Sequence, residues 1–87
     1  MKRLPPRRKS RRAAAASHLS RGLALERAGH HLDAVDAFGE AVRLDPDDPD
    51  AQMRLGLALR ELGRDEEANR AFLAALRLRE AFAAGGH

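Results

Sequence analysis

Histidines and a few hydroxyl side chains are the residues through which this 87-residue sequence could carry chemistry. The adjacent His30 and His31 could bind a metal ion, but a metal site needs three or four converging ligands, and adjacent residues point in different directions. Ser17 and His18 diverge for the same reason, so they do not form a nucleophile with its base. Ser17 is interpreted more simply as a helix N-cap. We therefore expect no metal, no cofactor and no enzymatic activity.

Aspartates gather in a second polar cluster, between residues 45 and 50. They are Asp45, Asp47, Asp48 and Asp50. Their spacing is similar to that of an oxygen-rich calcium loop, but two prolines interrupt the run, and the central Gly and closing Glu of such loops are missing. We interpret the run as a turn between helices, with Asp48 as the N-cap and Pro49 as the first residue of the next helix.

Basic residues are concentrated at the start of the chain. They are Lys2, Arg3, Arg7, Arg8, Lys9, Arg11 and Arg12. The whole chain has 16 basic and 13 acidic side chains. Without these seven basic residues, the remainder of the chain has 9 basic and 13 acidic side chains, a net charge of −4. Because Pro5–Pro6 blocks a helix and the like charges repel, we predict that residues 1–14 form a disordered basic arm. Such an arm could bind nucleic-acid phosphates, an anionic membrane surface or an acidic protein, although it lacks aromatic residues for base stacking.

Composition limits the elements that could position these residues. The chain has no cysteine, which removes disulfides and thiolate chemistry, and its length allows one small domain. No apolar run is long enough to cross a bilayer or to serve as a secretory signal, so we expect a cytoplasmic protein without a membrane span. Abundant alanine, with more arginine than lysine, is typical of a GC-rich, bacterial genome.

A repeat of 34 residues organises most of the chain. Between positions 17–44 and positions 51–78, eleven of 28 residues are identical. The matching residues of the first copy are Gly22, Leu23, Ala24, Leu25, Gly29, Ala34, Ala37, Phe38, Ala41, Arg43 and Leu44. Recurrence of Gly, Ala and Phe at the same phase is not expected by chance, so we predict two tandem copies of one structural unit.

Each copy is predicted to contain two helices. The apolar spacing indicates a first helix from about Ser17 to Gly29 and a second over residues 32–44. A third helix follows over residues 49–62 and a fourth from Asp65 to about Ala84.

Small residues at fixed positions predict how these helices pack. Gly22 and Gly56 would let a neighbouring helix approach closely, and Ala34 and Ala68 would do the same from the other helix of each pair. Phe38 and Phe72 would fill the wider space beyond.

These features resemble the tetratricopeptide repeat, a helix–turn–helix unit of 34 residues. Leu55–Gly56, Ala68 and Phe72 fit its motif in the second copy. Gly22, Ala34, Phe38 and Pro46 fit it in the first copy. Departures from the motif are Leu25 and Leu59 in place of Tyr, His18 and Gln52 in place of Trp, Arg21 in place of Leu, and Glu80 in place of the closing Pro.

The resemblance covers about residues 15–80 and implies an all-α fold, a fragment of an α-solenoid. Its two helix–turn–helix units would span residues 15–48 and 49–84, followed by a tail at residues 85–87. Arg21 suggests that the outer side of the first unit is exposed to solvent. The absent Pro at Glu80 suggests that the last helix continues as an end cap.

The resemblance also implies a concave groove that binds a peptide or a helix and is lined by the first helix of each unit. The residues placed there are Leu19, Leu23, Glu26, Arg27, Met53, Leu57, Arg60 and Glu61. Leu19, Leu23 and Leu57 stand where family members that grip a C-terminal carboxylate carry polar residues, so we expect no such clamp. The alternative is that these Leu and Met side chains pack inside the domain.

The expected function is therefore a protein–protein interaction module, which binds a peptide or helix or assembles with a partner or with itself. Repeat arrays of this kind usually need at least three units, so two units leave an apolar end face exposed. The alternative is a nucleic-acid-associated protein that uses its basic arm on phosphates.

Overall fold

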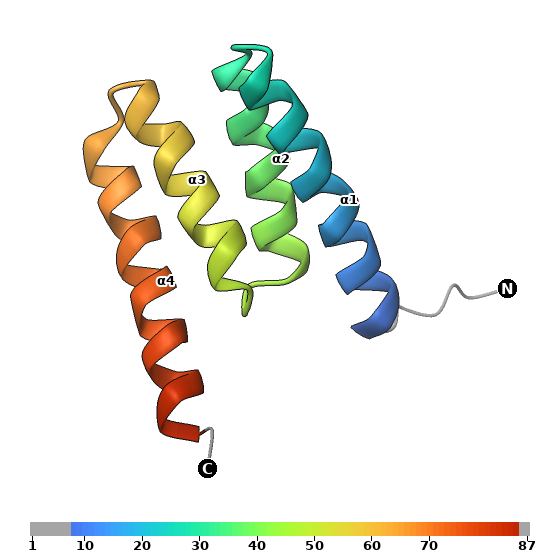
Figure 1. Cartoon of the computed structure of the whole chain (residues 1–87), viewed down its shortest axis with the longest axis vertical. Helices are drawn as coiled ribbons and strands as arrows, with labels where there is room; N and C mark the ends of the chain where they lie inside the picture. Colours follow the sequence, from blue (N-terminus) through green and yellow to red (C-terminus); the bar gives the residue numbers. More distant parts are fainter. Residues whose placement is uncertain (1–7, 86–87) are drawn as a thin grey trace, which may run out of the picture.

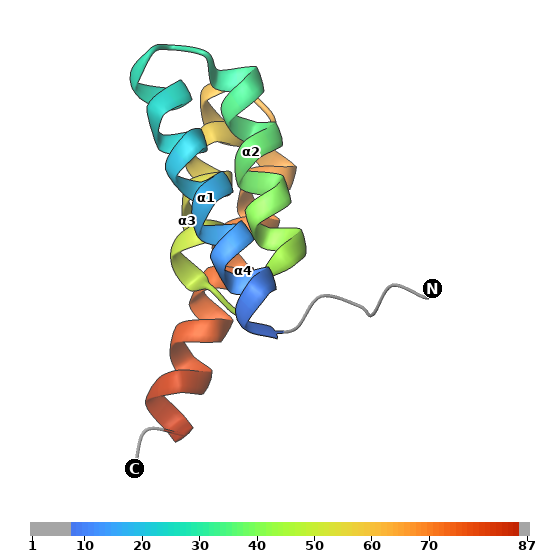
Figure 2. The ribbon, with the colours of Figure 1, turned by 90° about the vertical axis from the view of Figure 1, so that its right-hand side faces the viewer.

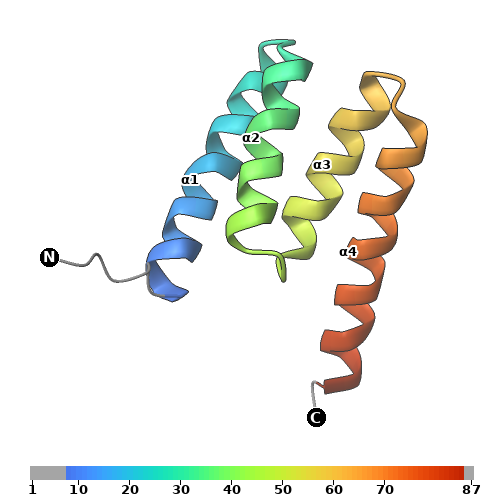
Figure 3. The ribbon, with the colours of Figure 1, turned by 180° about the vertical axis from the view of Figure 1, so that it is seen from behind.

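The protein consists of helices stacked in chain order. The computed structural model describes residues 8–85, which form α1 (Arg8–Arg27), α2 (His31–Leu44), α3 (Pro49–Glu61) and α4 (Asp65–Gly85) (Figure 1). Extensive contacts join α1 with α2, α2 with α3, and α3 with α4. The result is a slab of 43 × 38 × 19 Å, seen from behind in Figure 3, in which the four helices follow one another in a row. The predicted all-α fold of two helical hairpins is confirmed.

Each hairpin turns at a glycine in the left-handed region. Gly29 has a φ of 82° and Gly63 a φ of 77°. The N–H of Gly29 donates to the carbonyl of Glu26 at 3.0 Å, and the N–H of His30 donates to that of Leu25 at 2.8 Å. This pair of bonds is a Schellman motif, which satisfies carbonyls at the end of α1, and the turn at Gly63 repeats it. The predicted stops at both glycines are confirmed.

The acidic run forms the turn that joins the two hairpins. The Asp48 side chain accepts a hydrogen bond of 2.9 Å from the N–H of Asp50, and Pro49 is the first residue of α3. This cap satisfies one of the free N–H groups at the start of the helix. The prediction of Asp48 as the N-cap is confirmed.

Alanine makes up most of the hydrophobic core. The buried apolar residues are Ala15, Ala34, Ala37, Phe38, Ala41, Ala51, Ala58, Leu59, Ala68, Ala71 and Ala75. Phe38 is the largest fully buried side chain among the described residues. Short side chains let the helices lie close together, so the slab can be thin and still exclude water from its centre.

The glycines that recur in both repeats, Gly22 and Gly56, make room for the phenyl rings of Phe38 and Phe72. A Cβ built on Gly22 would lie 2.5 Å from Cε1 of Phe38, and one on Gly56 would lie 2.6 Å from Cε1 of Phe72. In each hairpin the phenyl ring therefore occupies the volume that a larger side chain at the glycine position would fill. This corrects the sequence interpretation, in which the helix backbone approached the glycine and the ring filled a space beyond it.

Two predictions about the start of the chain are wrong. Residues 8–14 belong to α1, not to a disordered arm, and Ser17 lies in the middle of that helix, so it is not an N-cap. Ala15 is buried, which anchors this part of α1 against the fold. Arginine and alanine are strong helix formers, and lengthening an anchored helix carries no nucleation cost, so the like charges do not prevent it. The arm residues at positions 1–7 lie outside the described residues.

The last helix is longer than its counterpart in the first hairpin. α4 has 21 residues and α2 has 14. The predicted extension of the last helix is present, but Gly85, which was assigned to the tail, is still helical. Within the part of the chain that is described, no helix is both long and apolar enough to cross a membrane.

Candidate protein-interaction surfaces

The residues predicted to line a groove lie on α1 and α3. In Figure 2 these two helices share one side of the slab, and α2 lies on the other. Leu19 and Leu23 are half-buried and pack against the core residues Ala34, Phe38 and Ala58. Both leucines therefore belong in part to the hydrophobic core, as the alternative interpretation proposed.

On α3, the predicted groove residues are more available. Met53 and Leu57 are half-buried, and neither belongs to the core cluster around Phe38. Arg60 and Glu61 are exposed one turn further on, and the Arg60 guanidinium carbon lies 5.8 Å from the centre of the Phe72 ring. A cation at this distance from a ring face is attracted to it, so Arg60 has a preferred position.

On α1, the predicted charged residues differ from each other. Arg27 is exposed. Glu26 is half-buried, and its Oε2 atom is buried with no hydrogen-bond partner among residues 8–85. Arg27 is therefore the more accessible of the two side chains.

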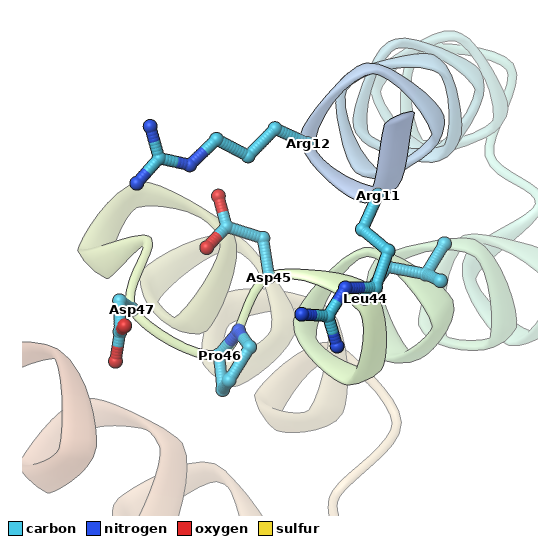
Figure 4. A pocket seen from close by; sticks show the side chains of 6 residues that line it. All are labelled: Arg11, Arg12, Leu44, Asp45, Pro46 and Asp47. Carbon is cyan, nitrogen blue, oxygen red and sulfur yellow. The ribbon is translucent and has the colours of Figure 1, made fainter. Parts of the chain in front are cut away.

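The start of α1 faces the turn between α2 and α3. Figure 4 shows the side chains of Arg11 and Arg12 above that turn, with Arg12 extended over the aspartates. Together with Leu44, Asp45, Pro46 and Asp47 they line a hollow of about 140 Å³. The acidic turn thus compensates part of the positive charge at the start of α1. Sequence reasoning placed these residues in separate elements and missed this arrangement.

A second hollow adjoins the first and is more apolar. It measures about 340 Å³ and is lined by Arg12, Asp47, Leu78, Ala81 and Phe82. Phe82 is 60% exposed. The 4-residue spacing of Leu78 and Phe82 is the sequence signal for a shared helix face, but the residues across the hollow are far away in the chain.

The end of the stack leaves an apolar surface uncovered. We call Asn69, Phe72, Leu73 and Leu76 the outer face of α4. They occupy the repeat positions of Val35, Phe38, Gly39 and Val42 on α2. Phe38 is fully buried and Val42 half-buried, whereas Phe72 is half-buried and Leu73 and Leu76 are 51% and 52% exposed. The difference arises because α3 packs on α2 and nothing among residues 8–85 packs on this side of α4. The predicted apolar end face is therefore present.

The described histidines do not gather with other metal-ligating side chains. Among residues 8–85 no three His, Cys, Asp or Glu side chains gather closely enough to hold a metal ion. The Nδ1 atom of His18 lies 3.1 Å from a guanidinium nitrogen of Arg21. His18 is thus paired with Arg21, one helical turn further along α1.

Two helical hairpins, repeated at 34 residues and stacked side by side, define an α-helical repeat protein. The family model described as the tetratricopeptide repeat matches residues 7–49 and, in a second overlapping match, residues 19–83. The chain therefore belongs to the tetratricopeptide repeat family, whose repeats generally mediate protein–protein interaction. A search of curated proteins finds no match to this chain.

Proposed function

We propose that this protein is an interaction module that binds a peptide or helix of another protein along α1 and α3. Met53 and Leu57 on α3 carry the proposal, because they are apolar, partly accessible and not needed by the core cluster around Phe38. Burying such side chains against a ligand removes apolar surface from water and favours binding.

Charges at one end of this surface support a ligand of mixed polarity. Arg27, Arg60 and Glu61 are exposed and lie in the last turns of α1 and α3, and both helices end at the same end of the slab (Figure 1). A ligand with apolar residues in its centre and charges of both signs at one end is complementary to this arrangement.

A library of short peptides displayed on phage, selected against the intact chain, tests the proposal. Selected peptides should lose affinity about tenfold or more for Met53→Glu, since a charge would replace a buried apolar contact. Exchanging the two charges, with Arg60→Glu and Glu61→Arg, should change which peptides are selected. The matched control Arg70→Glu, an exposed α4 residue, should leave binding unchanged. If no peptide is selected, or if the selected peptides tolerate Met53→Glu, the proposal is wrong.

Binding of nucleic-acid phosphates is the second candidate. It is favoured by Lys9, Arg11 and Arg12, which are all exposed in the first turns of α1. Labelled DNA duplexes should bind less tightly as salt is raised, and replacing the three residues by Glu should abolish binding. Binding that resists both changes would exclude phosphate neutralisation at this end of α1.

A further inference from the structure

The uncovered outer face of α4 raises the question of what covers it in solution. On α2, which packs against α3, the equivalent positions are less exposed: Phe38 is fully buried and Val35 and Val42 are half-buried, although a Cβ on Gly39 would meet no atom within 4 Å. The covering surface of α3 consists of small and apolar residues, including Ala51 and Ala58, which are 1% and 0% exposed. A helix that covers the outer face of α4 must offer similarly little polar surface.

Stacking of a second copy head to tail does not meet this requirement. In that arrangement α1 of the second copy would pack on α4 of the first copy, in the way that α3 packs on α2 within one chain. The α1 positions that correspond to Ala51, Leu55 and Ala58 of α3 are Ser17, Arg21 and Ala24, and all three are exposed. Two of them are polar, and Arg21 would lose its hydration against the apolar Leu73 and Leu76. The open side of α1 is therefore built to face water.

The apolar surface that best matches the outer face of α4 is the same face of another α4. The charges near this face favour such a pairing, because acidic residues lie at the start of α4 and the basic Arg77 and Arg79 lie further on, with Glu80 as an acidic exception after them. Asp65 and Arg79 stand seven residues before and seven residues after Phe72, so the 3.6-residue helical period puts both on the Phe72 side of the face. Glu66 and Arg77 lie on the other side of the face, and their midpoint falls between Ala71 and Phe72.

We propose that two copies of this chain pair through the outer faces of α4, antiparallel and around a two-fold axis near Phe72. The proposal rests on the interaction function proposed above and names one partner, a second copy of the chain. In this arrangement Asp65 lies opposite Arg79 of the second copy, and Glu66 lies opposite Arg77 of the second copy. Two-fold symmetry forms each pair twice and closes the assembly at a dimer.

The mass of the intact chain in solution tests this pairing. Light scattering over a dilution series should show a particle of twice the 9.5 kDa chain mass that dissociates on dilution. The double variant Leu73→Glu, Leu76→Glu should be a helical monomer by circular dichroism, since four buried charges would oppose pairing. The matched control Leu32→Glu changes a leucine on α2 that is 58% exposed, and it should remain a dimer.

A charge exchange tests the orientation. Asp65→Arg alone and Arg79→Asp alone each place like charges opposite one another twice, so each should weaken the dimer about fivefold. The double variant Asp65→Arg, Arg79→Asp should recover most of the lost affinity, because the opposite charges then face each other again. Head-to-tail stacking and parallel pairing predict no such recovery.

Several outcomes would overturn the proposal. One is a chain that stays monomeric up to the millimolar range, and another is a mass that grows beyond the dimer with concentration. A third is a dimer unaffected by Leu73→Glu and Leu76→Glu. A fourth is a double variant Asp65→Arg, Arg79→Asp whose loss of dimer affinity equals the sum of the two single losses. Peptide binding along α1 and α3 is measured separately, with Met53→Glu. A monomer that still binds selected peptides would therefore contradict the α4 pairing and leave the proposed function standing.

Discussion

Replacing Gly22 by alanine tests whether the glycine-to-phenyl contact holds the first hairpin together. The added methyl carbon would lie 2.5 Å from Cε1, 2.6 Å from Cδ1 and 3.0 Å from Cζ of Phe38. Carbon atoms in contact prefer about 3.5–4.0 Å, so the ring must move by about 1 Å. Phe38 is 0% exposed and cannot move without displacing its neighbours.

The expected size of the effect combines two opposing contributions. Overpacking a closed core costs about 1–3 kcal/mol, whereas alanine favours a helix over glycine by about 1 kcal/mol. We therefore expect Gly22→Ala to lower the free energy of unfolding by up to about 2 kcal/mol. Gly39→Ala is the matched control, because its methyl group would meet no atom within 4 Å. It should raise stability by about 0.5–1 kcal/mol.

Urea denaturation followed by circular dichroism, at one fixed chain concentration, measures both variants. Fixed concentration is needed because self-association adds to apparent stability. The change Phe38→Leu should cost stability in the native chain and much less in the Gly22→Ala background, because a smaller side chain relieves the clash. If Gly22→Ala is as stabilising as Gly39→Ala, the ring does not occupy the glycine position and the argument fails.

Three further changes test local features. Asp48→Ala should lower stability by about 1 kcal/mol in thermal melts, because α3 loses its N-cap; an unchanged melt would contradict that role. Gly63→Ala should lower it by about 1–2 kcal/mol, because φ at this turn is 77°, and a stabilising effect would refute the strain. The hydrogen bond from Arg43 lowers the pKa of Glu40, so this ion pair stabilises the fold above the unfolded-state pKa and loses its effect as pH falls through the folded-state pKa. Glu40→Gln should therefore flatten the acid side of the stability profile slightly, whereas a profile that steepens would contradict this sign.

Features set by neighbouring residues could be predicted from the sequence. Gly29 and Gly63 end their helices because the Schellman turn needs a left-handed residue, which glycine adopts without strain. Asp48 and Pro49 start α3 through contacts that span only three residues. The 34-residue period then predicted the pairing of helices within each hairpin, since each copy of a repeat forms the same helix–turn–helix unit.

Features that depend on tertiary contact could not be predicted in the same way. The start of α1 was misjudged because charge repulsion is visible in the sequence, while the burial of Ala15 is not. The hollow between Arg12 and Phe82 joins residues from opposite ends of the chain, which no local pattern connects. Leu19 and Leu23 have the spacing of both a groove and a core, and only their packing against Phe38 decides in favour of a share in the core.

The chain-order packing of the four helices has a consequence for how the protein forms. Extensive contacts join only helices that are neighbours along the chain, so folding needs no early meeting of distant segments. Helical proteins with such low contact order fold in microseconds to milliseconds. The first hairpin can therefore close on the ribosome while the second is still being synthesised.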